Sequence, residues 1–154
     1  FSITGFDDEL KDYLKDKNHH IEFLGKKGFD EIQVYLSKCS FTIVPSECYD
    51  NFPNSLLESF AFKKCAVTTN TGGLKELVID NETGLLFEIK DIPDLKKKIT
   101  YLFSNEAICQ NLGENAFNKL NNEYSAREHY KKLSNLFENV VTNYQTANKS
   151  GIKV

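Results

Sequence analysis

Short β-rich runs alternate with amphipathic helical patterns along the first half of this chain, and this alternation constrains its fold more than any other feature. The expected strands cover residues 1–4, 21–24, 41–45, 65–69 and 84–87. Strands that alternate with helices are typical of βαβ units, whose strands lie parallel in one sheet. After residue 87 the pattern is wholly helical, with Asp91 as an expected N-cap and a capping-box spacing between Ser125 and Glu128 before the last helix. The sequence therefore predicts an α/β fold with a parallel sheet.

The composition suits one globular domain. The 154 residues are 40% hydrophobic and 27% charged, which is enough apolar material for a single core. The formal net charge of -3 gives no basic footprint for nucleic acid. The four cysteines lie far apart without a CxxC pair, so neither a zinc ribbon nor a redox dithiol is indicated. No apolar run approaches the roughly 20 residues that span a bilayer, and we expect a soluble, cytoplasmic chain.

The stretch from residue 44 to residue 73 carries the candidate site. In it a strand, an acidic turn, a helix, a second strand and a Gly-Gly turn follow one another closely. Pro53 suits the first helical position, where its missing N–H costs nothing, and the N–H groups of Asn54, Ser55 and Leu56 are then expected to be free. A helix start at the carboxyl end of a parallel strand attracts anions and lies where open α/β sheets bind ligands. The stretch therefore predicts a site for a phosphorylated ligand.

Two carboxylates, Asp50 and Glu58, lie eight residues apart across this helix start. Glu58 falls more than one turn into the helix, where it is expected to reach a group such as a ribose diol, and Asp50 is expected to reach the other end of the ligand. Gly72 and Gly73 follow the second strand, and they permit positive φ and a close approach of the backbone to a ligand. A plainer interpretation stays open, in which Asp50 caps the helix, Glu58 is solvated and the glycines form an ordinary turn.

Residues 44–87, VPSECYDNFPNSLLESFAFKKCAVTTNTGGLKELVIDNETGLLF, resemble the donor-binding signature of retaining GT-B glycosyltransferases of family GT4. The shared pattern is Pro-Ser, an acidic residue, Phe-Pro, a second Glu, a Gly-Gly-x-x-Glu turn and a Thr-Gly-hydrophobic strand. Residues 1–5 and 21–25 and the closing helix with Tyr130 are also similar to the corresponding parts of the family. The resemblance implies a doubly wound, Rossmann-like fold, that of the C-terminal lobe of GT-B, which binds a nucleotide-sugar donor.

The resemblance also implies roles by position. Glu58 is expected to hold the ribose hydroxyls and Asp50 the transferred sugar, and these two are the expected catalytic residues. The expected donor-binding residues are Phe52, Pro53, Asn54, Ser55, Leu57, Gly72 and Gly73, with Leu24, Gly25, Lys26 and Lys27 beside the base. No metal and no cofactor are expected, because backbone N–H groups and a helix dipole stabilise a leaving diphosphate without them.

Two features depart from the family pattern. Asp50 stands where the family has a Glu, whose side chain is one methylene longer, and Glu47 is a spare carboxylate nearby. The chain begins at what resembles the second strand of the lobe, so the first strand and helix are expected to be lacking, with a gap between the strands at 1–4 and 41–45. We therefore expect part of a longer enzyme, with a donor lobe over 1–141, a polar irregular tail over 142–154 and an N-terminal acceptor lobe in the same protein.

The function that the resemblance implies is the transfer of a hexosyl-type sugar from a nucleotide diphosphate sugar, UDP-linked, to a saccharide acceptor with retention of configuration. The acceptor is expected to be lipid-linked, in bacterial surface polysaccharide or O-antigen-type biosynthesis, with the protein peripheral at the inner face of the cytoplasmic membrane. These residues alone are expected to be inactive. The alternatives that stay open are a GT-B fold epimerase or phosphorylase and a non-catalytic nucleotide-binding module.

Overall fold

The computed structural model describes residues 2–3, 21–49 and 52–149 of the chain. The chain divides into two compact units, residues 1–39 and 40–154, where the composition predicted one domain. In the first unit, β1 (Ser2–Ile3) and β2 (Glu22–Phe23) pair in parallel and are followed by α2 (Phe29–Lys38). Leu36 is buried on α2, whereas Phe29 at its start is 53% exposed, so only some of the apolar residues of this helix belong to the core.

The second unit holds a parallel sheet in the order β3-β4-β5, made of β3 (Thr42–Val44), β4 (Ala66–Thr69) and β5 (Gly84–Phe87). With β1 and β2, all five predicted strands are confirmed, each within its expected bounds. The predicted gap between the strands at 1–4 and 41–45 stays a prediction.

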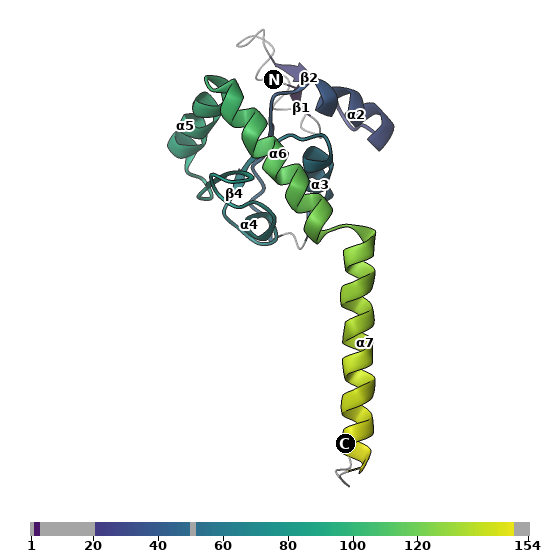
Figure 1. Ribbon diagram of the computed structural model, residues 1–154. Helices are drawn as coiled ribbons and strands as arrows, with labels where there is room; N and C mark the ends of the chain where they lie inside the picture. Colours follow the sequence, from purple (N-terminus) through teal and green to yellow (C-terminus); the bar gives the residue numbers. More distant parts are fainter. Residues whose placement is uncertain (1, 4–20, 50–51, 150–154) are drawn as a thin grey trace. The chain divides into compact units, whose positions relative to one another are not determined.

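Helices cover both faces of the three-stranded sheet, and α6 (Glu106–Glu123) passes beside α3 and α5 in Figure 1. On one face, Ala66 of β4 packs with side chains of α3 (Asn54–Ala61) and α4 (Leu74–Leu77). On the other face, Val67 packs with Leu102 of α5 (Ile92–Phe103), and α6 contributes residues to both cores. All four residues of β4 are buried, as is typical of a central parallel strand. The layers confirm the doubly wound α/β fold.

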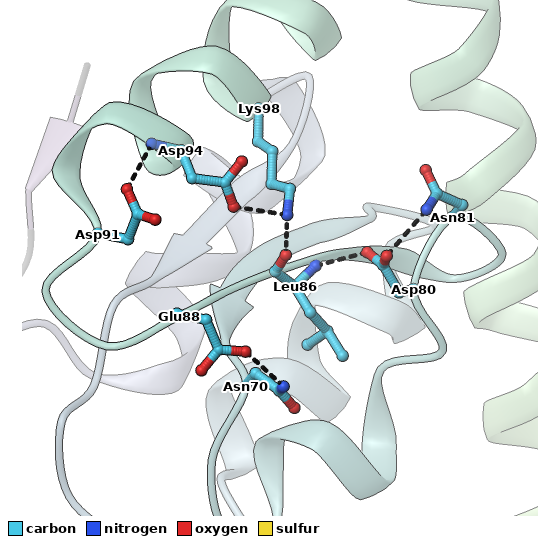
Figure 2. Close-up of polar contacts among 8 residues, drawn as sticks. All are labelled: Asn70, Asp80, Asn81, Leu86, Glu88, Asp91, Asp94 and Lys98. Carbon is cyan, nitrogen blue, oxygen red and sulfur yellow. Dashed lines mark hydrogen bonds and ion pairs between the residues drawn. The ribbon is translucent and has the colours of Figure 1, made fainter.

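Side chains cover the outer edge of β5, as Figure 2 shows. The Leu86 N–H donates to Asp80 Oδ1 (2.8 Å), and Lys98 Nζ donates to the Leu86 carbonyl while it pairs with Asp94 Oδ2 (2.8 Å). An edge strand otherwise presents N–H and C=O groups with which other chains can pair. These two side chains therefore satisfy the Leu86 backbone at the edge of the sheet.

The C-terminal helices begin as predicted, but the last one is longer than expected. Asp91 Oδ1 accepts a hydrogen bond from the Asp94 N–H (2.9 Å) and Ser125 Oγ accepts one from the Glu128 N–H (3.3 Å). α7 (Ala126–Lys149) continues past residue 142, so the prediction of an irregular tail is wrong for residues 142–149. The physical reason is that no Gly or Pro interrupts residues 126–149. None of the described helices is long and apolar enough to cross a membrane.

Candidate functional site

The candidate site lies at the carboxyl end of the three-stranded sheet, where the loop after each strand is tied to its neighbours. Thr69 Oγ1 donates to the Ser46 carbonyl (2.5 Å), which joins the end of β4 to the loop after β3. In that loop Ser46 Oγ accepts a hydrogen bond from the Cys48 N–H (3.2 Å). The loop that leads into α3 is therefore anchored where it leaves the sheet.

The loop after β5 is tied to both of the others. The Asn70 N–H donates to the Phe87 carbonyl (2.8 Å), and Asn70 Nδ2 donates to Glu88 Oε1 (2.8 Å; Figure 2). Lys90 Nζ lies 3.7 Å from Glu47 Oε2, with side chains 75% and 58% exposed, so this ion pair is weak. Glu47, the spare carboxylate of the sequence, thus has a cationic neighbour. The three loops therefore form one connected surface at the carboxyl end of the sheet.

The start of α3 differs by one residue from the prediction. Pro53 is the N-cap, with an extended backbone (φ -72, ψ 112), and the helix begins at Asn54. The Leu56 N–H donates to the Pro53 carbonyl (3.1 Å), so the prediction that it is free is wrong, because a tight first turn closes onto the N-cap carbonyl. The N–H groups of Asn54 and Ser55 have no hydrogen-bond partner within the described ranges. Within that part of the chain, two donors at the helix start are therefore unpaired, as an anion-binding helix start requires.

The side chains at this helix start differ in exposure. Pro53 is buried, Asn54 and Ser55 are exposed, and Glu58 one turn later is partly buried. Asp50, the other predicted catalytic carboxylate, lies outside the described residues. The structure thus places Glu58 on the same helix as the two available N–H groups, and the part assigned to Asp50 stays a prediction.

The site is flanked by an aromatic contact, and this contact was not predicted from the sequence. The ring of Phe52, which is 46% exposed, lies 5.4 Å from the ring of Tyr124 at an angle of 56°. Lys119 Nζ lies 5.6 Å from the same Tyr124 ring. Leu57, predicted to bind the donor, packs against the core shared by α3, α4 and α6. No periodicity links Phe52 with Tyr124, because Tyr124 ends a helix far along the chain.

The Gly-Gly turn after β4 has the backbone that its residues allow. Gly72 has a φ of +48, a conformation that favours glycine, which confirms the expectation of a positive φ in this turn. Gly73 is helical (φ -66) and is the N-cap of α4, and its carbonyl accepts from the Leu77 N–H (3.1 Å). With four residues, α4 is too short to make an anion site of its own, and donor binding by Gly72 and Gly73 stays a prediction.

The residues predicted to lie beside the base belong to the first unit. Leu24, Gly25, Lys26 and Lys27 follow β2, and Gly25 has a φ of +67. Lys27 Nζ pairs with Glu31 Oε1 (2.9 Å), and this hydrogen bond raises the pKa of Lys27 and lowers that of Glu31. Glu31 Oε2 also accepts from the N–H at the start of α2, at residue 28 (3.1 Å). Lys27 therefore has a structural partner, and base binding by these four residues stays a prediction.

The described residues of the second unit present no metal-binding group, and a hollow elsewhere on its surface holds none of the predicted site residues. Within the described residues, no three or more His, Cys, Asp or Glu side chains are grouped so that they could hold a metal ion. A surface hollow of about 640 Å³ lies along α5 and is lined by Pro93, Lys97 and Tyr101, among others. None of the predicted site residues lines it. The described site residues of this unit lie instead after β3 and β4, on the side of the sheet where these strands end.

A parallel sheet with helices on both faces and a helix start at its carboxyl edge is the arrangement of nucleotide-binding α/β proteins. Residues 4–119 match the model of the family described as glycosyl transferases group 1, and the chain belongs to this family. Glycosyltransferase MJ1178 of Methanocaldococcus jannaschii is 44% identical over 102 residues, which cover 66% of this chain and 29% of that protein. The family and the fold agree with the resemblance seen in the sequence.

Two further similarities bear on fold and chemistry. The N,N'-diacetylbacillosaminyl-diphospho-undecaprenol alpha-1,3-N-acetylgalactosaminyltransferase of Campylobacter jejuni is 31% identical over 96 residues, 62% of this chain and 25% of that protein. The crystal structure of Anabaena HepE in complex with UDP-glucose has a TM-score of 0.77 at 17% identity and covers 90% of this chain and 40% of that one. The fold is thus that of GT-B glycosyltransferases. The chain spans less than half the length of each of these proteins.

Proposed function

We propose that the full-length protein is a retaining glycosyltransferase, which moves a sugar from a UDP-linked donor to a saccharide acceptor, and that residues 1–141 supply the donor lobe. The observation that carries the proposal is the start of α3 at the carboxyl end of the sheet, where the Asn54 and Ser55 N–H groups have no partner among the described residues and Glu58 follows on the same helix. Family membership and the UDP-glucose bound to HepE support a nucleotide-sugar ligand.

The chemical task at this edge is to stabilise the diphosphate as it leaves. Negative charge grows on its oxygens while the bond to the anomeric carbon breaks and the sugar becomes oxocarbenium-like. The two N–H groups and the dipole of α3 meet that charge, and a helix dipole contributes typically ~0.3 to 1 kcal/mol per charge before specific hydrogen bonds. The proposed reaction therefore needs no metal and no cofactor.

The two carboxylates have separate proposed roles. Glu58 accepts hydrogen bonds from the ribose hydroxyls, since it lies a turn beyond the N–H groups that hold the diphosphate. Asp50 orients the hydroxyls of the transferred sugar. Neither acts as a covalent nucleophile, because the acceptor hydroxyl attacks the sugar from the face that the diphosphate leaves.

The proposed acceptor is a lipid-linked saccharide in the synthesis of a bacterial surface polysaccharide of the O-antigen type. The support is the Campylobacter jejuni relative, whose name gives a diphospho-undecaprenol saccharide as its acceptor. Such an acceptor would bring the full-length protein to the inner face of the cytoplasmic membrane as a peripheral protein. The acceptor surface itself is expected on the N-terminal lobe.

Calorimetric titration of the full-length protein tests the donor site. The ligands are UDP-glucose, UDP-N-acetylglucosamine and GDP-mannose, and the variant is Glu58→Gln. Hydrogen bonds to a charged group contribute about 1.5–3 kcal/mol, so the variant is expected to bind the donor at least about tenfold more weakly. The matched control is Glu114→Gln, which removes an exposed carboxylate paired with Lys63 and should leave affinity unchanged. Absence of binding by any nucleotide sugar would contradict the proposal.

Product analysis separates the transferase from its rivals. Incubation of the donor with and without a lipid-linked acceptor is expected to give a glycosylated product only when the acceptor is present, and the product should keep the anomeric configuration of the donor. Isomerisation of the donor without an acceptor would instead indicate an epimerase. Turnover that persists in excess chelator is the expected result for a reaction without a metal.

A further inference from the structure

Thr71 precedes the two glycines of the turn after β4, and its side-chain hydroxyl is buried without a hydrogen-bond partner in the part of the chain that the structure describes. The residue is 3% exposed, and among the described residues its Oγ1 is the one buried side-chain polar atom without a hydrogen-bond partner. Burial of a hydroxyl costs desolvation free energy, and without a partner no hydrogen bond offsets this cost. Native structures hold few such groups, and each one calls for an explanation.

The other buried threonines of this unit show that the fold pairs its hydroxyls wherever it buries them. Thr68 Oγ1 donates to the Val44 carbonyl (2.9 Å), and Thr69 Oγ1 donates to the Ser46 carbonyl (2.5 Å). Thr83 Oγ1 accepts a hydrogen bond from the Ile79 N–H (2.8 Å). Thr71 therefore departs from the pattern set by three residues of the same type in the same sheet region.

The backbone of Thr71 is held in place by three hydrogen bonds. Its N–H donates to the Thr69 carbonyl (2.9 Å), and its own carbonyl accepts from the N–H groups of Leu74 (3.1 Å) and Lys75 (3.4 Å). The next residue, Gly72, has a φ of +48. The Thr71 hydroxyl is thus unpaired among the described residues at the carboxyl end of the sheet, two residues after Thr69, which anchors the loop before α3.

We propose that Thr71 is a binding residue of the donor site, whose hydroxyl gains its partner when the nucleotide sugar binds. The inference rests on the proposed function. The bound donor offers oxygens of a diphosphate and of a sugar, and the Thr71 hydroxyl donates a hydrogen bond to one of them. Because Oγ1 is buried before the ligand arrives, the Gly72–Gly73 turn shifts slightly on binding, which two glycines allow. The free energy lost by the unpaired hydroxyl is recovered in the complex.

The test compares Thr71→Val, which keeps the shape and removes the hydroxyl, with Thr71→Ser, which keeps the hydroxyl. Both are made in the full-length protein and titrated with UDP-glucose, UDP-N-acetylglucosamine and GDP-mannose. The Val variant is expected to bind the preferred donor about tenfold more weakly, since one hydrogen bond is lost. Its thermal unfolding midpoint without ligand should equal or exceed that of the unchanged protein. The Ser variant is expected to bind within about threefold of the unchanged protein, because its hydroxyl remains.

The control is Thr83→Val, which removes a paired hydroxyl at the opposite end of β5. It is expected to lower the unfolding midpoint and to leave donor affinity unchanged, the reverse of Thr71→Val. If the unchanged protein binds a donor and Thr71→Val binds it equally well, the inference fails and the donor site stands. A lower midpoint for Thr71→Val would also overturn it, because the hydroxyl would then be paired in the fold. If the unchanged protein binds no donor, the proposed function fails and the inference with it.

Discussion

The two ends of the three-stranded sheet use glycine for different reasons. At the amino end, a Cβ on Gly113 of α6 would collide with the Lys63 carbonyl oxygen, and a Cβ on Gly84 would collide with that of Ala66. At the carboxyl end, Gly72 is required by a φ of +48 instead. Glycine at the first end permits close packing, whereas at the second it permits a turn.

The amino end of the sheet contributes to the stability of the fold, whereas the carboxyl end holds the groups proposed to bind the ligand. The amino end is closed by contacts between backbone and backbone, and its buried cysteines, Cys65 and Cys109, belong to the core. The carboxyl end is held by hydrogen bonds and an ion pair between loops, and it keeps two helix N–H groups and one buried hydroxyl without partners in the described part of the chain. Substitutions at the amino end should therefore change the free energy of unfolding, and substitutions at the carboxyl end should change ligand affinity.

The largest contrast is expected in thiol reactivity. Cys48 is exposed in the loop after β3 at the carboxyl end, whereas Cys65 and Cys109 are buried at the amino end. Burial also raises the pKa of Cys109, which lowers its reactive thiolate fraction. Cys48 should react with Ellman's reagent at least about 100-fold faster than either buried thiol, since these require opening of the fold.

The control for this labelling is Cys48→Ser, which should remove the fast phase. Cys39, which is partly buried in the first unit, accounts for a phase of intermediate rate. Mass spectrometry of the labelled peptides identifies each site. Labelling of Cys65 or Cys109 as rapid as that of Cys48 would mean that the amino end is open.

The next effect in size concerns Gly113→Ala. Alanine usually stabilises a helix relative to glycine by roughly 1 kcal/mol. Here the added methyl would push α6 away from the Lys63 carbonyl, so a net loss of about 1–3 kcal/mol in the free energy of unfolding is expected in urea denaturation. Donor affinity of the folded protein should not change.

Gly28→Ala is the matched control for this substitution. Its Cβ would meet Glu31 Oε2 at 3.8 Å, an ordinary contact, and its φ is -75. The expected change is below about 1 kcal/mol, because only the capping preference differs. If Gly113→Ala stabilised the protein, α6 would not be packed as closely on the start of β4 as the structure has it.

The sequence predicted the helices, strands and turns of the second unit better than the contacts between them. The strands, the caps at Asp91 and Ser125 and the Gly72 turn were all predictable, because periodicity and local residue chemistry determine them. The start of α3 was predicted one residue too early, because the Pro53 backbone is extended, with a ψ of 112, and Pro53 is the N-cap rather than the first helical residue. The contact of Phe52 with Tyr124 depends on how α6 crosses α3, which no local pattern encodes.

A smaller effect is expected at the Gly-Gly turn. Gly72→Ala places a Cβ on a residue with a φ of +48, at a cost of about 1–2 kcal/mol. Gly72→Asn is the control, because Asn tolerates this backbone better and should cost less. Both the unfolding midpoint and the affinity for the preferred donor are to be measured. Equal stability of the Ala variant and the unchanged protein would show that this φ is not required.

The smallest effect tests the ion pair between the loops, and it also tests the assignment of the sugar carboxylate. Lys90→Ala should change the free energy of unfolding by less than about 1 kcal/mol, because Lys90 and Glu47 are exposed, and added salt should reduce the difference further. Glu47→Gln should behave alike, with donor affinity unchanged in both variants. A drop in affinity for Glu47→Gln alone would assign the sugar hydroxyls to Glu47 instead of Asp50. Glu47 would then be the longer carboxylate that the family pattern has at this edge.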